Sequence, residues 1–139
     1  MRHAFTIVEL IVVICILGVL TAIAVPWAGN LLDRVRVRGA VVEVESLFNG
    51  ARHTAIARSA QATVDIDTLA QVISVSVGSD TLRRGEIGVN HGVHLSANRV
   101  RMSYAATGMG YGAANLSVFV RRNASADTVF VSRLGRLRH

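Results

Sequence analysis

The 139-residue sequence contains no lysine, one cysteine and one proline. Because the single cysteine, Cys15, has no partner within the chain, the sequence excludes a disulfide-stabilised secreted fold. Acidic residues are scarce after Glu86, where Asp127 is the only carboxylate beside seven arginines. The whole formal net charge of +6 therefore falls in the C-terminal part. Such an asymmetry indicates a polyanionic partner, such as nucleic acid or a lipid surface.

Residues 10–32 form the longest run without a charged side chain, 23 residues in all. A helix of this length crosses about 30 Å of hydrocarbon. The run is longer than the apolar core of a secretory signal peptide, and no convincing small-residue cleavage site accompanies it. We therefore expect it to be retained as a membrane anchor, and residues 33–139 to make one small domain.

An acidic residue, Glu9, directly precedes this run. An ionised carboxylate costs about 2.5–3.5 kcal/mol at the middle of a membrane and less near its edge, so we expect a compensating charge. If the chain were cut before Phe5, the new α-amino group would lie one helical turn from Glu9, on the same face. That amine, from the same chain or a neighbouring one, is the natural partner of the carboxylate.

The residues Arg2-His3-Ala4, followed by Phe5-Thr6-Ile7-Val8-Glu9, resemble the short basic leader and mature start of type IV prepilins and pseudopilins. The resemblance implies cleavage between Ala4 and Phe5 by a membrane peptidase, N-methylation of Phe5, and a role for Glu9 in docking subunits into a helical filament. Residues 1–4 would be the leader, and residues 5–32 the transmembrane and filament-core half of a long helix. The sequence departs from the family at Ala4, where glycine is nearly always found.

Two further positions match helix features of pilins. Gly18 and Pro26 stand where pilin helices carry a glycine and a proline that kinks the helix. Pro26 cannot donate a backbone hydrogen bond to the carbonyl of Ala22, and its ring clashes with that turn. We therefore expect the helix to bend or loosen there.

Beyond residue 32, the spacing of apolar residues predicts first a helix and then strands. Steps of three and four residues predict that the helix continues to about residue 59. A period of two predicts strands over residues 62–67, 73–77 and 93–104, the last broken near residues 97–98, and a hairpin over residues 115–122 and 128–133. Residues 78–92 are rich in turn formers. The pattern predicts an α+β fold in which one long helix packs on a small antiparallel sheet.

The C-terminal strands and the closing Gly135-Arg136-Leu137-Arg138 resemble the FimT/GspH group of minor pilins and minor pseudopilins. In FimT-type minor pilins of transformable bacteria, a terminal Gly-Arg-x-Arg motif contacts DNA. The resemblance therefore implies DNA contact at Gly135, Arg136 and Arg138.

The residues support a phosphate-binding patch independently of the resemblance. Gly135 permits a turn after a strand, and Arg136 and Arg138 then project on one side of an extended chain. Further basic residues on the adjacent predicted hairpin are Arg121, Arg122 and Arg133. The alternative is a solvated terminus whose arginines keep the domain soluble. Tyr104 and Tyr111 could add base stacking, although such rings in a small domain more often lie in the core or at its rim.

Other candidate sites are weak. His91 and His94 lie in a glycine-rich segment without a third ligand nearby in the sequence, so we expect no metal site. Asp65 and Asp67 fall on one strand face, where they could bind a cation or face water. No nucleophile, base and orienting acid can be assembled, so we predict no enzyme and no cofactor.

The sequence thus favours a minor pilin with a single membrane span in the bacterial inner membrane before assembly. Its head, residues 33–139, would then lie in the periplasm or outside the cell on a filament. The expected partners are other pilin subunits, the prepilin peptidase and, through the arginine-rich face, DNA. The alternatives are a structural minor pseudopilin of a type II secretion system without DNA binding, and a single-span membrane protein with a soluble ligand-binding domain that forms no filament.

Overall fold

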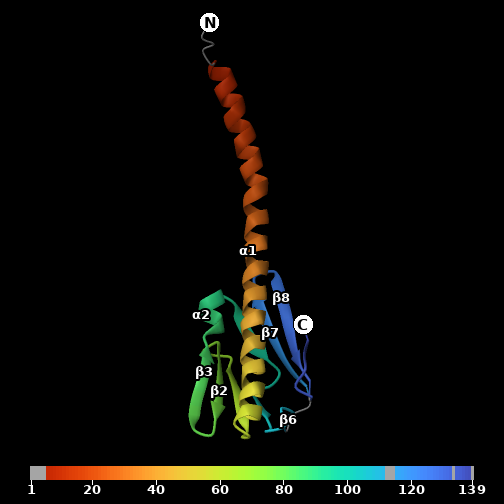
Figure 1. The fold of residues 1–139 in the computed structure, drawn as a ribbon. Coiled ribbons are helices and arrows are strands. Elements are labelled where there is room, and N and C mark those ends of the chain that lie inside the picture. Colours follow the sequence, from red (N-terminus) through yellow and green to blue (C-terminus); the bar gives the residue numbers. More distant parts are fainter. Residues whose placement is uncertain (1–5, 112–114, 133, 139) are drawn as a thin grey trace. The chain divides into compact units, whose positions relative to one another are not determined.

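The computed structural model describes residues 6–111, 115–132 and 134–138, and it divides the chain into two units, Met1–Leu32 and Asp33–His139. Helix α1 (Ile7–Ala57) runs through both units (Figure 1). The leader, its cleavage site at Ala4 and Phe5, and the N-methylation site at Phe5 lie outside the described residues.

In the first unit, Thr6 caps the N-terminus of α1. The backbone N–H of Glu9 donates a hydrogen bond to Thr6 Oγ1 at 3.2 Å. A threonine followed three residues later by glutamate has the spacing of a capping box. A carboxylate in the first turn also interacts favourably with the positive end of the helix dipole. Glu9 therefore sits where local helix physics favours an acid. The helix then continues without interruption past Gly18 and Pro26, and the kink expected there stays a prediction.

The same part of α1 exposes almost nothing but apolar side chains. Every residue from Thr6 to Leu32 is exposed. An 18-residue window of this helix has a mean hydropathy of 2.9, and none of the window is buried. By length and composition α1 can cross a membrane, so this surface requires a lipid or protein covering.

In the second unit, the remaining part of α1 carries an apolar stripe. The buried residues recur every three or four positions, as the sequence predicts for one face of a helix. These residues are Val37, Ala40, Val41, Val44, Leu47, Phe48, Ala51 and Ala55. The helix ends at Ala57, within two residues of the predicted end.

Two antiparallel sheets supply the rest of the second unit. The first sheet has the order β3-β2-β1-β5-β6. Its strands are β1 (Ala62–Asp67), β2 (Val72–Val77), β3 (Asp80–Gly85), β5 (Arg101–Tyr104) and β6 (Gly110–Tyr111). The second sheet has the order β4-β7-β8-β9. Its strands are β4 (His94–Ala97), β7 (Leu116–Arg122), β8 (Ser125–Val131) and β9 (Leu137–Arg138).

Both sheets turn one face to the helix stripe. In β1, Ala62, Val64 and Ile66 are buried while the alternate residues are not. In β7, Leu116, Val118 and Val120 are buried in the same way. The inward residues of both sheets join the helix stripe in one hydrophobic cluster, and Figure 1 shows β2 and β3 on one side of α1 and β7 and β8 on the other. The predicted α+β architecture is confirmed.

Gln71 links the two sheets through backbone groups. It lies between β1 and β2 with a positive φ of 61°. Its side-chain Nε2 donates to the carbonyl of Leu95 in β4 at 3.1 Å, and its Oε1 accepts the N–H of the same residue. The amide thus pairs with β4 as a neighbouring strand would, which joins the first sheet's turn to the second sheet.

Three expectations about the strands were wrong in detail. Residues 78–92 are not only turns, because they hold β3 and the short helix α2 (Ile87–His91). β3 is a sheet edge rich in arginine, and charged edges lack the apolar alternation that marks a strand. The strands on either side of the break near residues 97–98 belong to different sheets, so there are two sheets rather than one. The final hairpin turns more tightly than predicted, with β8 beginning at Ser125.

A charged contact fastens the tip of the β7–β8 hairpin to α1. Asp33 Oδ1 accepts a hydrogen bond from Arg122 Nε at 2.6 Å, and Asp33 Oδ2 accepts one from Asn123 Nδ2 at 2.7 Å. The side chains of Asp33 and Arg122 are 13% and 24% exposed. Arg122 also donates to the carbonyl of Gly92, which ends α2. The hydrogen bonds from Asn123 and Arg122 lower the pKa of Asp33 below its ordinary value.

This contact predicts an acid-dependent loss of stability. Because the pKa of Asp33 is lower in the folded chain than in the unfolded chain, its stabilising effect is complete above the unfolded pKa and fades as the pH falls below about 4. We expect Asp33→Asn to lower the thermal midpoint at pH 7 and to reduce its decline between about pH 5 and pH 3. Circular dichroism melts measure both effects. Asp80→Asn, at an exposed carboxylate that begins β3, is the control. An unchanged pH profile for Asp33→Asn would contradict this role.

Candidate functional site

The C-terminal Gly-Arg-Leu-Arg segment folds as a turn followed by an edge strand. The N–H of Gly135 donates to the carbonyl of Ser132 at 2.9 Å, and the N–H of Ser132 donates to the carbonyl of Arg136 at 2.9 Å. The N–H of Arg136 also donates to Ser132 Oγ at 3.1 Å. β9 then pairs Leu137 with Val131 of β8. Leu137 is half-buried against the core, and Arg136 and Arg138 on either side of it are exposed.

Gly135 is buried and holds this turn against the rest of the domain. Its φ is 73°, which L side chains rarely adopt. A Cβ at this position would lie 2.9 Å from the carbonyl oxygen of Gly108 and 3.2 Å from Cε1 of Tyr104. That Gly108 oxygen also accepts a hydrogen bond from Arg52 Nε of α1 at 3.1 Å. The close approach of two turns beside α1 fixes where the terminal arginines emerge.

Tyr104 is buried beside these two turns and is not part of the surface. The residue is fully buried, and its hydroxyl has no hydrogen-bond partner among the residues that the structure describes. Burial raises the pKa of Tyr104 to about 12, although the charge of Arg52 acts in the opposite direction. Tyr104 therefore cannot stack on a base, whereas Tyr111 of the first sheet is 68% exposed.

A groove of about 350 Å³ opens beside the two terminal arginines. Arg136 and Arg138 line it together with Phe130 of β8, which is 51% exposed. None of its described lining residues carries a carboxylate. The described residues that line the groove are Asn115, Phe130, Val131, Ser132, Leu134, Arg136 and Arg138. Two guanidinium groups without a neutralising acid make this groove suited to a phosphate or another anion.

The structure divides the arginine patch that the sequence predicts. Arg138 pairs with Phe130, whereas Arg121 pairs with Ala126, four residues away along β8, or roughly 14 Å. Arg121 is exposed, but Arg122 is held by Asp33 and the carbonyl of Gly92. Arg133 lies outside the described residues. The groove therefore contains Arg136 and Arg138, with Arg121 apart from it on the same sheet.

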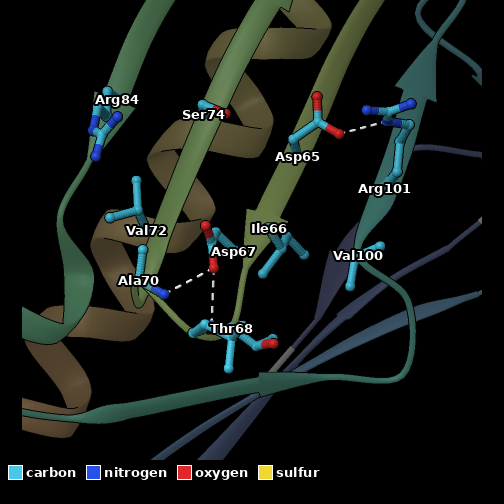
Figure 2. Close-up of a pocket in the computed structure, with 11 residues that line it drawn as sticks. Asp65, Ile66, Asp67, Thr68, Ala70, Val72, Ser74, Arg84, Val100 and Arg101 are labelled. Atoms are coloured by element: carbon cyan, nitrogen blue, oxygen red, sulfur yellow. Dashed lines mark hydrogen bonds and ion pairs between the residues drawn. The ribbon is translucent and has the colours of Figure 1, made fainter.

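A second hollow, of about 500 Å³, lies on the first sheet and carries both signs of charge (Figure 2). Arg101 Nε donates to Asp65 Oδ1 across β1 and β5. Asp67 Oδ1 accepts the backbone N–H groups of Leu69 at 2.9 Å and Ala70 at 2.8 Å. Asp65 and Asp67 share one strand face, and local partners occupy both. Their carboxylates make this hollow unsuited to phosphate.

The histidines considered as metal ligands have different surroundings. His91 Nε2 lies 2.6 Å from Glu43 Oε2 and so connects α2 to α1. His94 is exposed at the start of β4. Within residues 6–111, 115–132 and 134–138, no three histidine, cysteine or acidic side chains cluster closely enough to hold a metal ion.

Two exposed aromatic residues were not among the site residues predicted from the sequence. Phe119 of β7 and Phe130 of β8 are 43% and 51% exposed. Their position could have been read from the strand period, because each alternates with buried valines such as Val118 and Val129. That period places both rings on the face of the second sheet that is turned away from the helix.

Replacement of Gly135 should destabilise the C-terminal turn. We expect Gly135→Ala to lower the free energy of unfolding by about 2 kcal/mol, since a side chain here adopts left-handed backbone and meets the Gly108 carbonyl. Gly78→Ala is the matched control, because Gly78 has a φ of 61° with no atom within 4 Å of the added Cβ. Urea unfolding measures the difference. Equal losses for the two variants would show that the contact with Gly108 is unimportant.

The fold has counterparts among solved structures. A crystal structure of the type IV minor pilin FimU of Pseudomonas aeruginosa matches with a TM-score of 0.67 and 14% identity, over 78% of this chain and 90% of that chain. A second crystal form of FimU matches with a TM-score of 0.62 and 14% identity, over 73% of this chain and 90% of that chain. No protein-family model and no curated protein sequence matches. With a long apolar N-terminal helix packed on antiparallel sheets, the chain has the type IV pilin fold.

Proposed function

We propose that the chain is a minor pilin, assembled into or at the tip of a type IV filament. The observation that carries the proposal is the combination of the pilin fold with an α1 whose residues from Ile7 to Leu32 are all exposed and mostly apolar. The similarity to FimU, which is described as a type IV minor pilin, supports this role. The role is structural and requires no catalytic group.

The exposed half of α1 explains both stages of such a life cycle. Lipid of the inner membrane covers it before assembly, and the helices of neighbouring subunits cover it in the filament, while the head lies in the periplasm or outside the cell. Cleavage between Ala4 and Phe5 by the prepilin peptidase, followed by N-methylation of Phe5, precedes assembly. The new terminus of one subunit then pairs with Glu9 of its neighbour. Gly18 and Pro26 allow the helix to bend as subunits pack.

Substitutions of Glu9 separate a charge pair from a helix cap. Glutamine preserves the capping spacing that Thr6 and residue 9 share, but it removes the charge. We expect Glu9→Gln and Glu9→Leu both to abolish incorporation into filaments. Immunoblots that compare the amount of the protein in sheared filaments with the amount in the membrane fraction measure incorporation. Thr6→Ala, which removes only the observed cap, should leave incorporation unchanged. Normal incorporation of Glu9→Gln would contradict the charge-pairing role of Glu9.

The groove beside Arg136 and Arg138 is proposed as a non-specific DNA contact that serves uptake in natural transformation. The groove binds phosphate through guanidinium groups and lacks acidic lining residues among those described, and phosphate contacts by themselves carry no sequence information. Gly135 contributes by fixing the turn. Arg121 extends the contact, whereas Arg122, held by Asp33, does not. Arg133 remains a candidate from the sequence alone.

Duplex binding by the full chain in non-ionic detergent tests this contact. With about three phosphate contacts, from Arg121, Arg136 and Arg138, the log–log slope of affinity against salt should be about −3. We expect Arg136→Gln combined with Arg138→Gln to weaken binding at least about tenfold at low salt and to bring the slope to about −1. Fluorescence anisotropy of a labelled duplex measures both quantities.

A matched pair of arginines provides the control. Arg83 and Arg84 are exposed on β3, at the edge of the first sheet, and Arg84 lies 3.7 Å from Glu86. Replacement of both by glutamine changes the net charge equally and should leave the affinity for DNA nearly unchanged. If both pairs weaken binding equally, net charge and not the groove explains it. If the wild-type chain binds no DNA at low salt, the alternative of a structural minor pseudopilin in type II secretion is favoured.

A further inference from the structure

On the face of the second sheet turned away from α1, the residues that the structure describes carry no carboxylate. Cross-strand pairing places Ser117, Phe130 and Arg138 in one row, and Ser96, Phe119 and Thr128 in the next. The third row contains His94, Arg121 and Ala126. No residue in these rows is acidic, since Asp127 lies opposite Val120 on the other face. The face is cationic and aromatic, unlike the mixed face of the first sheet.

The exposed rings and arginines follow one another across this face. Arg138 is directly opposite Phe130, and Phe130 is a diagonal neighbour of Phe119 because Phe119 pairs with Thr128. Diagonal neighbours lie about 7–8 Å apart, within reach of aromatic side chains. Arg121 follows Phe119 two residues along the same strand face. A cation therefore stands at each end of a two-ring track roughly 20 Å long.

Phosphate contact alone does not account for this arrangement. A duplex hides the faces of its bases, so two half-exposed phenylalanines would gain little from it beyond contact with the backbone. A single strand offers unstacked bases, and an aromatic ring binds any base because every base has a π-face. Sheets that bind single-stranded RNA use exposed aromatic residues in the same way. The cationic ends match the phosphates that flank the stacked bases.

We propose that this face binds single-stranded nucleic acid, with bases stacked on Phe119 and Phe130 and phosphates held by Arg138 and Arg121. The inference rests on the proposed DNA contact and names the form of DNA that the contact prefers. The groove at Arg136 and Arg138 is continuous with the track, because Phe130 and Arg138 border both. A strand that enters at the groove passes Phe130 and then Phe119.

The test compares three fluorescent probes with the full chain in non-ionic detergent: an oligothymidylate, an abasic strand with the same number of phosphates, and a duplex of the same length. We expect the oligothymidylate to bind roughly tenfold or more tightly than the abasic strand. Phe119→Leu combined with Phe130→Leu keeps apolar side chains in both strands but removes the rings. This variant should bind the oligothymidylate and the abasic strand with equal affinity. Its affinity for the abasic strand should equal that of the wild type.

The controls separate stacking from charge and from misfolding. Tyr111→Leu removes an exposed ring from the first sheet and should change no affinity. Thermal melts of the variants must coincide with that of the wild type. Equal wild-type affinities for the abasic strand and oligothymidylate overturn the stacking track and leave the phosphate contact intact. Absence of binding to every probe overturns both the stacking track and the phosphate contact. Unchanged strand binding by the phenylalanine variant, with loss of filament incorporation, overturns the track in favour of a subunit interface.

Discussion

The apolar stripe along the second half of α1 is the constraint on which the head of this protein depends. Three of its members, Ala40, Ala51 and Ala55, are fully buried alanines, so the strands can approach the helix closely beside them. Two sheets are needed to cover the stripe, and each uses its inward valines for that purpose. Because the helix occupies the inner faces of both sheets, only their outward faces and edges remain available to partners.

The outward faces carry different chemistry although the chain has arginines throughout. On the first sheet, Arg101 pairs with Asp65, so the charge is balanced locally. On the second sheet, Arg121 and Arg138 lie on a face whose described residues include no carboxylate, and Arg122 points to the opposite side, where Asp33 holds it. Two adjacent arginines in the sequence thus have opposite roles. Arg122 is a structural clamp, whereas Arg121 is exposed and, among the described residues, its Nε donates only to the carbonyl of Asn123, at 3.4 Å.

The elements that sequence reasoning predicted well are those with strong periodicity. The helix stripe and β1 follow periods of 3.6 and 2, because burial on one face imposes those periods on the sequence. β3 and α2 were missed, since an edge strand such as Asp80–Gly85 has one neighbour and five residues such as Ile87–His91 complete little more than one helical turn. The division into two sheets was also missed, because alternation shows that a strand has two faces but not which strand it pairs with.

The sequence by itself determined the long helix, its exposed apolar half, the position of Glu9 in the first helical turn, and the excess of arginine near the C-terminus. These are local properties, fixed by composition and by spacing along one segment. Only the tertiary structure decided that Gly135 packs against Gly108, that Arg122 is held by Asp33, and that Phe119 and Phe130 share a face with Arg138. Such contacts depend on register and strand order, which bring together residues that are distant in the chain.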